Sequence, residues 1–236
     1  MKLLAFDTST ELISIAVMRV VDGQVRVWQH TGAGGAQASS ALIPAIETLM
    51  AEADLRFEAL DAIAFGRGPG SFTGLRTACA VAQGLGFGAG VPLLPVDTLL
   101  AVAEEARAQQ APQQQRLQVL ALLDARMDEL YAAPYEYDDG RWQQREDFSL
   151  LKPEHLVLHG SDAVAGNVFA EYGERLPLPR NVSCWQALPT AAAMLRLAPQ
   201  LLAQGNAVAA AEALPRYIRD KVALTTAERA AAKAGH

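Results

Sequence analysis

The chain has 236 residues, a net charge of −6 at pH 7 and a hydrophobic content of 51%. Because its mean hydropathy is +0.10, the composition excludes a disordered protein and allows one large core or two smaller ones. The acidic balance argues against a protein that binds nucleic acid alone, since clustered Lys and Arg supply the phosphate contacts of such proteins.

The sequence shows no sign of export or membrane attachment. Its first residues hold one lysine and an apolar run that Asp7 interrupts, which is too short for a signal peptide. The sequence contains no run of 18 apolar residues, so it predicts no membrane span. Cys79 and Cys184 form neither a C-x-x-C pair nor a disulfide framework, so we expect reduced, buried thiols. These features predict a cytoplasmic protein.

Three β-prone runs and a helical pattern begin the chain. The runs cover residues 2–7, 13–21 and 24–29, and the last two are joined by Asp22-Gly23, a dipeptide preferred in type I′ hairpin turns. Apolar residues then recur at helical spacing over residues 39–50, where Pro44 is tolerated because it lies in the first turn. We therefore expect three antiparallel strands and a first helix.

A strand, a glycine-rich loop and a second helix follow. Residues 61–65 form an apolar run, the glycines around Pro69 predict a tight turn, and Ser71 or Thr73 can cap a helix over residues 73–88. Backbone N–H groups at such a helix start attract anions, which would suit a phosphate site. The Lys of a Walker loop and the spacing of a dinucleotide-binding loop are both missing, so a tight turn with a cap is the favoured alternative.

The second helix carries small residues along one side. Glycines inside a helix each cost about 1 kcal/mol relative to Ala, so some packing must offset them. At 100° per residue, one stripe comprises Gly74, Thr77, Ala80, Gly84 and Gly88. The stripe fits a subunit interface, where another backbone approaches closely, or packing on the protein's own sheet. The last glycines could also simply end the helix.

The second half of the chain repeats the strand-first order. A short strand over residues 92–96 and a helix over residues 98–109 precede the polar segment 111–116, which is the best candidate for a domain border. Beyond it lie β-prone runs at residues 117–124, 129–137 and 141–148, then expected helices at residues 163–172 and 191–204. Asp7 and Asp124 each end the first strand of a half and precede a hairpin, which indicates an internal repeat of architecture.

Four segments resemble the TsaB (YeaZ) family, bacterial relatives of the tRNA threonylcarbamoyl transferase subunit TsaD in the actin-like and sugar-kinase-like ATPase superfamily. They are LAFDTST at residues 4–10, residues 66–77 with 82–85, LDARMDELY at residues 123–131 and PRYIR at residues 215–219. The resemblance covers nearly the whole chain. It implies an α/β fold of two tandem actin-like ATPase (ribonuclease H-like) domains, each opening with antiparallel strands in a mixed sheet flanked by helices. The implied parts are residues 1–110, a smaller domain of residues 111–222, and a disordered tail of residues 223–236.

The resemblance also implies a role and an interface. TsaB pairs with TsaD, together with the ATPase TsaE, to make threonylcarbamoyladenosine beside the anticodon of tRNA, and it can pair with a second copy of itself. The family's interface helices correspond to residues 39–50 and 73–88 here. The implied partner-interface residues are Leu42, Ile46, Gly74, Thr77, Ala80, Val81, Gly84, Leu85 and Gly88. This chain would reach tRNA only through the complex.

The metal ligands of TsaD are missing from this sequence. TsaD holds its metal with an H-x-x-x-H pair, a spacing that places two imidazoles one helical turn apart. Alignment through Pro44 puts Ala38 and Leu42 at these positions, and neither side chain can bind a cation. His155 and His159 stand four apart, but the β-prone residues between them favour a loop or strand end. We expect no metal site, and we rank a metallopeptidase last among the functions considered.

Acidic residues of an ATPase site are present, while its glycine turns are missing. Asp7 with Thr8 and Ser9, and Asp124 in the other half, are candidates for a vestigial nucleotide or Mg²⁺ site, because hard cations prefer oxygen ligands. Alternatively, the Asp7 side chain forms hydrogen bonds with the turn that follows it, and Asp124 forms an ion pair with Arg126. We expect no catalytic residue and no cofactor held by this chain, with ATP and Mg²⁺ only at the interface of a complex.

Two hypotheses follow. The favoured one is a noncatalytic scaffold subunit that binds and activates TsaD through apolar helix packing. The alternative is an ATP-dependent small-molecule kinase or ATPase that uses the cleft between the domains.

Overall fold

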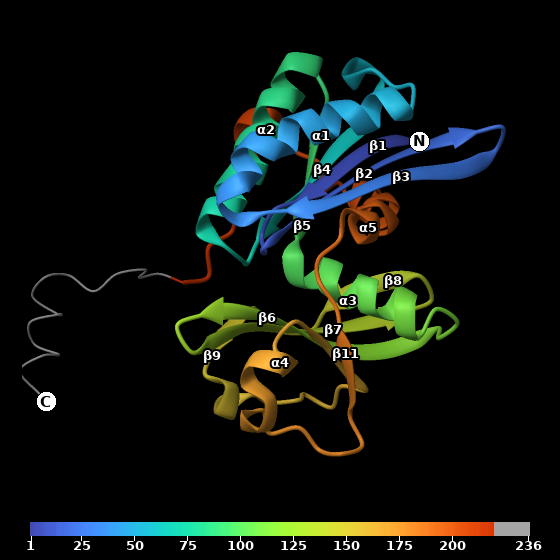
Figure 1. Cartoon of the computed structure of the whole chain (residues 1–236). Coiled ribbons are helices and arrows are strands. Elements are labelled where there is room, and N and C mark those ends of the chain that lie inside the picture. Colours follow the sequence, from blue (N-terminus) through green and yellow to red (C-terminus); the bar gives the residue numbers. More distant parts are fainter. Residues whose placement is uncertain (220–236) are drawn as a thin grey trace, which may run out of the picture.

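The computed structural model describes residues 1–219, in which two mixed sheets alternate with layers of helices (Figure 1). The predicted tail at residues 223–236 lies outside the described residues. None of the helices in the described part combines the length and apolar character that a bilayer span requires.

The first sheet has the strand order β3-β2-β1-β4-β5. Its strands are β1 (Lys2–Asp7), β2 (Leu12–Val21), β3 (Gln24–Ala33), β4 (Ala62–Gly68) and β5 (Leu93–Asp97). The first three strands are antiparallel, whereas β4 and β5 run parallel to β1. Asp22 and Gly23 both have positive φ, 51° and 77°, as a type I′ turn requires. The predicted opening hairpin is confirmed.

Helices cover both faces of this sheet (Figure 1). The outer face carries α1 (Ala38–Glu52) and α2 (Phe72–Ala89), and the inner face, which looks toward the second sheet, carries α3 (Thr98–Gln110) and α5 (Ala191–Ala203). Alternate residues of each central strand enter the two cores, so Leu4 and Phe6 of β1 face α1 and α2 while Leu3 and Ala5 face the inner helices.

The second sheet repeats the first, with the order β11-β10-β6-β7-β8 and β9 paired on β7. Its strands are β6 (Arg116–Arg126), β7 (Glu129–Asp138), β8 (Arg141–Gln144), β9 (Ser149–Leu151), β10 (Ala163–Gly166) and β11 (Ser183–Gln186). The short helix α4 (Phe169–Tyr172) lies on its outer face (Figure 1). In each sheet the first strand lies between an antiparallel hairpin and two parallel strands, so the predicted internal repeat is confirmed.

Three local predictions are wrong. Residues 163–166 form a strand, buried between β6 and β11, rather than the start of a helix. The hydrophobic periodicity of so short an apolar run does not distinguish a buried strand from a buried helix. The β-prone run at 141–148 is interrupted, since β8 ends at Gln144 and β9 begins at Ser149. Cys79 is buried as expected, but Cys184 is exposed.

The chain returns to the first sheet after completing the second. Helix α5 packs under β1 and β2, and Val208 then exchanges backbone hydrogen bonds of 2.8 and 2.9 Å with Leu93 of β5. The expected border at residues 110 and 111 falls between α3 and β6. The segment from α5 onward nevertheless packs largely against the first sheet.

Candidate functional site

One side of α2 is open to solvent. Ser71 begins the helix by accepting a hydrogen bond from the Gly74 N–H, and Gly90, with φ 69°, ends it. Ala80, Gly84 and Gly88 are exposed, and a Cβ added to either glycine would meet no heavy atom within 4 Å beyond the backbone of its own helix. The distal part of the small-residue stripe therefore points away from the protein's own sheet.

Other predicted interface residues lie deeper. Three of them are half-buried on the flank of α2: Thr77, Val81 and Leu85. Leu42 and Ile46 are fully buried between α1 and the sheet, so their side chains cannot contact a partner in this conformation. Gly74 is buried too, because a Cβ there would collide with the Thr8 carbonyl oxygen, and the Thr8 hydroxyl donates to the Gly74 carbonyl at 2.7 Å. These three residues, predicted for the partner interface, support the helices of that face from within.

Sequence reasoning missed two large exposed side chains. Phe87 of α2 is 86% exposed and Ile43 of α1 is 43% exposed. An aromatic residue between Gly86 and Gly88 at the outward angle of the helix was the available signal. We define the α2 face as the exposed residues Phe72, Thr73, Arg76, Ala80, Gly84, Phe87 and Gly88.

An aromatic and cationic cluster marks the N-terminal end of the α2 face. The Arg76 guanidinium lies 3.8 Å from the centre of the Phe72 ring, and its Nε donates to the Tyr217 hydroxyl at 3.0 Å. The rings of Phe72 and Tyr217 are 5.2 Å apart between centres. The end of the described chain is thus attached directly to α2.

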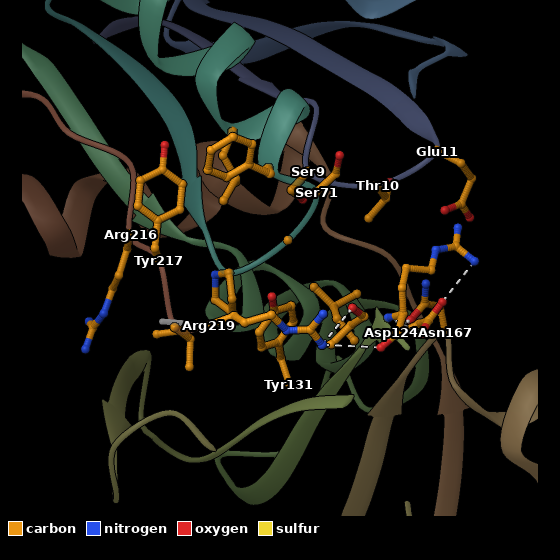
Figure 2. A pocket seen from close by; sticks show the side chains of 18 of the residues that line it. Ser9, Thr10, Glu11, Ser71, Asp124, Tyr131, Asn167, Arg216, Tyr217 and Arg219 are labelled. Carbon is orange, nitrogen blue, oxygen red and sulfur yellow. Dashed lines mark hydrogen bonds and ion pairs between the residues drawn. The ribbon is translucent and has the colours of Figure 1, made fainter. Parts of the chain in front are cut away.

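A pocket of about 410 Å³ opens between the two sheets (Figure 2). Ser9, Thr10 and Glu11 line it from the β1–β2 turn, and residues 124–127 line it from the β6–β7 turn. Much of the remaining wall comes from the start of α2 and the C-terminal segment, including Ser71, Phe72, Tyr217 and Arg219, and Tyr131 of β7 and Asn167 also line it. The corresponding turns of the two repeats therefore face each other across one cavity.

Comparison with known proteins identifies the family. The protein-family model described as TsaD, tRNA N6-adenosine threonylcarbamoyltransferase, matches residues 33–235 of this chain. The chain is 33% identical to the tRNA threonylcarbamoyladenosine biosynthesis protein TsaB of Escherichia coli (strain K12), over 94% of this chain and 96% of that protein. The Haemophilus influenzae TsaB is also 33% identical, over 93% and 94% of the two chains. The chain belongs to the TsaB (YeaZ) family.

A solved structure agrees with this assignment. YeaZ from Pseudomonas aeruginosa superimposes with a TM-score of 0.81 at 36% identity, covering 92% of this chain and 99% of that one. The predicted α/β fold of the TsaB family, with two mixed sheets flanked by helices, is confirmed.

Asp7, in the TsaB family segment at residues 4–10, is buried beneath the pocket rather than lining it. Its Oδ1 accepts hydrogen bonds from the Ser9 backbone N–H at 2.8 Å and from the Ser9 hydroxyl at 2.6 Å. Its Oδ2 is buried against Gly66 and has no hydrogen-bond partner among the described residues. Burial raises the pKa of Asp7 to about 6, although the bonds from Ser9 act in the opposite direction. The alternative in which Asp7 bonds its own turn is confirmed.

Asp124, at the equivalent place in the second repeat, does line the pocket, but its oxygens are engaged. One oxygen accepts from the Arg126 N–H and the Tyr172 hydroxyl, both at 2.8 Å, and the other lies 3.1 Å from the Arg126 guanidinium. The Asp124 backbone N–H donates to the Asn167 side chain at 3.0 Å. The predicted ion pair with Arg126 is confirmed. The structure brings Ser9 and Asp124 to one pocket and leaves Asp7 and Thr8 outside its lining.

His155 and His159 do not come together as ligands. His155 lies in a single 3₁₀ turn, Pro153–His155, whereas His159 lies in a loop where its Nδ1 is 2.8 Å from Glu146. Among residues 1–219, no three side chains of the His, Cys, Asp or Glu types are placed to share a metal ion.

Proposed function

We propose that this chain is a noncatalytic subunit in the synthesis of threonylcarbamoyladenosine in tRNA, which binds and activates TsaD through the α2 face. Family membership supports the process, because the curated relatives are named for it. The observation that carries the binding role is the open stripe of Ala80, Gly84 and Gly88 beside the exposed ring of Phe87. Small residues allow the backbone of a partner helix to approach closely, and an aromatic side chain beside them supplies an apolar anchor.

The assignment as a noncatalytic subunit has chemical support. The Asp124 oxygens are occupied by Arg126 and Tyr172, and Asp7 is removed from the pocket lining. A carboxylate that acts on substrate or on a hydrated Mg²⁺ needs an accessible oxygen.

A leucine at Gly84 tests the binding role. Because a side chain there meets open space in the subunit, Gly84→Leu should fold and gain helix propensity, yet it should obstruct close approach of a partner helix. We expect binding to purified TsaD, measured by calorimetry, to weaken at least about fivefold, the lower end of the effect of an overpacking cost of about 1–3 kcal/mol.

Gln110→Leu is the matched control. It adds an exposed leucine to α3, which lies on the opposite face of the sheet from α2 (Figure 1). TsaD binding should be unchanged in this variant. Full-strength binding of Gly84→Leu would contradict the assignment of the α2 face.

We further propose that two copies of the chain pair through the same face when TsaD is absent. TsaE and ATP with Mg²⁺ would join at the interface of the larger complex, and the net charge of −6 fits a subunit that reaches tRNA only through its partners. Sedimentation should show a dimer of the isolated chain that dissociates when TsaD is added. A dimer that persists in the TsaD complex would mean that the two contacts use different faces.

The alternative function is an ATP-dependent small-molecule kinase or ATPase. The pocket of about 410 Å³ between equivalent turns of the two repeats favours it, because ligands of two-lobed α/β proteins bind between the lobes. Calorimetry of the isolated chain with ATP and Mg²⁺ separates the two proposals. Tight binding that is lost in Asp124→Ala, at the carboxylate that lines the pocket, would support the enzyme, whereas no heat of binding would favour the subunit role.

A further inference from the structure

Residues 214–219 cross from the first sheet to the second, and we call this segment the strap. Its backbone lies against the end of β4, where the Arg216 N–H donates to the Arg67 carbonyl at 2.6 Å and a Cβ on Gly68 would collide with the Arg216 carbonyl oxygen. The Arg216 guanidinium lies 4.2 Å from the centre of the Phe148 ring, and Ile218 packs against the core between the sheets. The strap therefore touches both halves of the molecule.

The end of the strap holds the β6–β7 turn. One Arg219 nitrogen, Nη2, donates to the carbonyl oxygens of Ala125 and Arg126, both at 3.3 Å, and to the Glu129 carboxylate. A second nitrogen, Nη1, contacts the Met127 sulfur at 2.8 Å. Figure 2 shows this side chain reaching the turn along one wall of the pocket.

The turn that Arg219 holds is strained. Arg126, Met127 and Asp128 have φ values of 60°, 56° and 63°, and none of them is a glycine. Left-handed backbone is disfavoured for residues with a Cβ, and three in succession persist only where neighbours determine the conformation. Besides Arg219, Arg175 holds Asp128 at 2.6 and 3.0 Å. Withdrawing one of these side chains would therefore remove part of what fixes the turn in this conformation.

The strap also borders the α2 face. Tyr217, 44% exposed, contacts Phe72 and accepts the hydrogen bond from Arg76, and both of these residues belong to the face. Just before the strap, the Ala213 carbonyl accepts from the Gln83 amide at 2.9 Å and from the Cys79 thiol at 3.4 Å. A partner that covers Phe72 and Arg76 therefore removes water from the contacts that fix Tyr217.

We propose that the strap couples the α2 face to the pocket: docking of TsaD fixes Tyr217, and Arg219, two residues further on, then holds the β6–β7 turn in its left-handed conformation. This inference rests on the proposed function, because TsaD is the partner that covers the face. The turn forms one wall of the pocket, so partner binding sets the shape of that wall. By linkage, a change at Arg219 must alter affinity for the partner even though Arg219 does not belong to the α2 face.

Hydrogen exchange in the isolated chain tests the coupling between Tyr217 and the β6–β7 turn. Tyr217→Ala, which removes no contact to the turn itself, should speed amide exchange in peptides covering residues 125–130 by at least about fivefold, the lower end of typical coupling between sites. Tyr217→Phe, which keeps the ring contact and loses the bond from Arg76, should give a smaller acceleration. Leu214→Ala, at a strap residue that is 68% exposed, is the control and should leave the turn unchanged. Unchanged exchange in Tyr217→Ala overturns the coupling whether or not TsaD binds.

Titration with purified TsaD tests the coupling between partner binding at the α2 face and the β6–β7 turn. TsaD should slow exchange at residues 125–130 in the wild type and not in Tyr217→Ala, and Arg219→Gln should bind TsaD about fivefold more weakly. Equal affinity of Arg219→Gln and wild type would overturn the link to the partner. If the wild type itself does not bind TsaD, the proposed function fails, and the exchange data on the isolated chain still decide whether the strap controls the turn.

Discussion

Asp7 and Glu104 are both buried carboxylates, and their neighbours give them opposite preferences for charge. Asp7 has one oxygen without a partner, so burial dominates and raises its pKa to about 6. Burial also opposes ionisation of Glu104, but hydrogen bonds from Arg107, Trp142 and Arg196 outweigh it and lower the pKa of Glu104. The ionised form of Asp7 is thus a cost to the fold, whereas ionised Glu104 is part of it.

The raised pKa of Asp7 predicts a pH-dependent stability. The Asp7 carboxyl binds its proton more tightly in the folded state than in the unfolded state, where its pKa is 3.8. Protonated Asp7 therefore stabilises the fold fully below pH 3.8, and this stabilisation is lost as the pH rises to about 6. Relative to wild type, Asp7→Asn should gain about 3 kcal/mol in unfolding free energy between pH 3.5 and pH 7. Urea unfolding at a series of pH values measures this difference. Parallel stability curves for the two proteins would show that Asp7 titrates normally.

Asp7 also shows where prediction from sequence ends at this scale. A strand-end Asp followed by Thr-Ser predicts the turn it forms. The missing second partner depends on Gly66, 59 positions later, which leaves the space that the Oδ2 atom occupies. No local pattern carries that information.

Among the elements, α2 shows that similar glycines in one helix do different work. Gly74 allows the helix to lie against the Thr8 backbone, whereas Gly84 faces open space. The helix and its small stripe were predictable from spacing. The sequence could not predict which end of the stripe faces inward, because this depends on where the β1–β2 turn lies in the fold.

Alanine at these two positions should have opposite effects. Gly84→Ala should stabilise the chain by about 1 kcal/mol, because Ala favours the helix and nothing blocks its Cβ. Gly74→Ala gains the same propensity but forces Thr8 to move, and overpacking of this kind costs about 1–3 kcal/mol. Thermal unfolding of the two variants measures the contrast. A gain of stability in both would mean that the contact between Gly74 and Thr8 relaxes freely.

At the scale of the whole molecule, a buried network ties the two halves together. Glu104 of α3 accepts from Arg107 at 2.9 and 3.0 Å, from the indole N–H of Trp142 on β8 at 2.9 Å and from Arg196 of α5 at 2.6 Å. Its side chain is 4% exposed. One carboxylate therefore joins two inner helices to the second sheet.

Glu104→Ala should be strongly destabilising. Removing the carboxylate leaves the Arg107 guanidinium and the Trp142 indole N–H in the interior without their acceptor, whereas the more exposed Arg196 keeps its ion pair with Glu105. Breaking a buried pair typically costs about 3–5 kcal/mol. Denaturant unfolding measures the loss. Arg116→Ala is the control, because its ion pair with Asp138 is largely exposed and such pairs contribute little. Equal stability of the two variants would show that the network is dispensable.

The sequence predicted the repeated order of strands and the position of most elements. It did not predict the path of the chain after residue 190. The helix α5 was expected, but the face that it covers is decided by the inner side of β1 and β2, which is apolar whether or not a distant helix reaches it. Pairing of segments so far apart has no local signature.

The return of α5 and residues 207–213 to the first sheet determines when the protein can fold during synthesis. While the ribosome is still translating the second sheet, the inner side of β1 and β2 lacks part of its cover, and β5 lacks its pairing with Val208. The N-terminal half therefore cannot complete its core until almost the whole chain has emerged. A fragment that stops after α3 would leave that apolar surface in water and aggregate, so the two repeats form one cooperative unit rather than two modules that could be expressed separately.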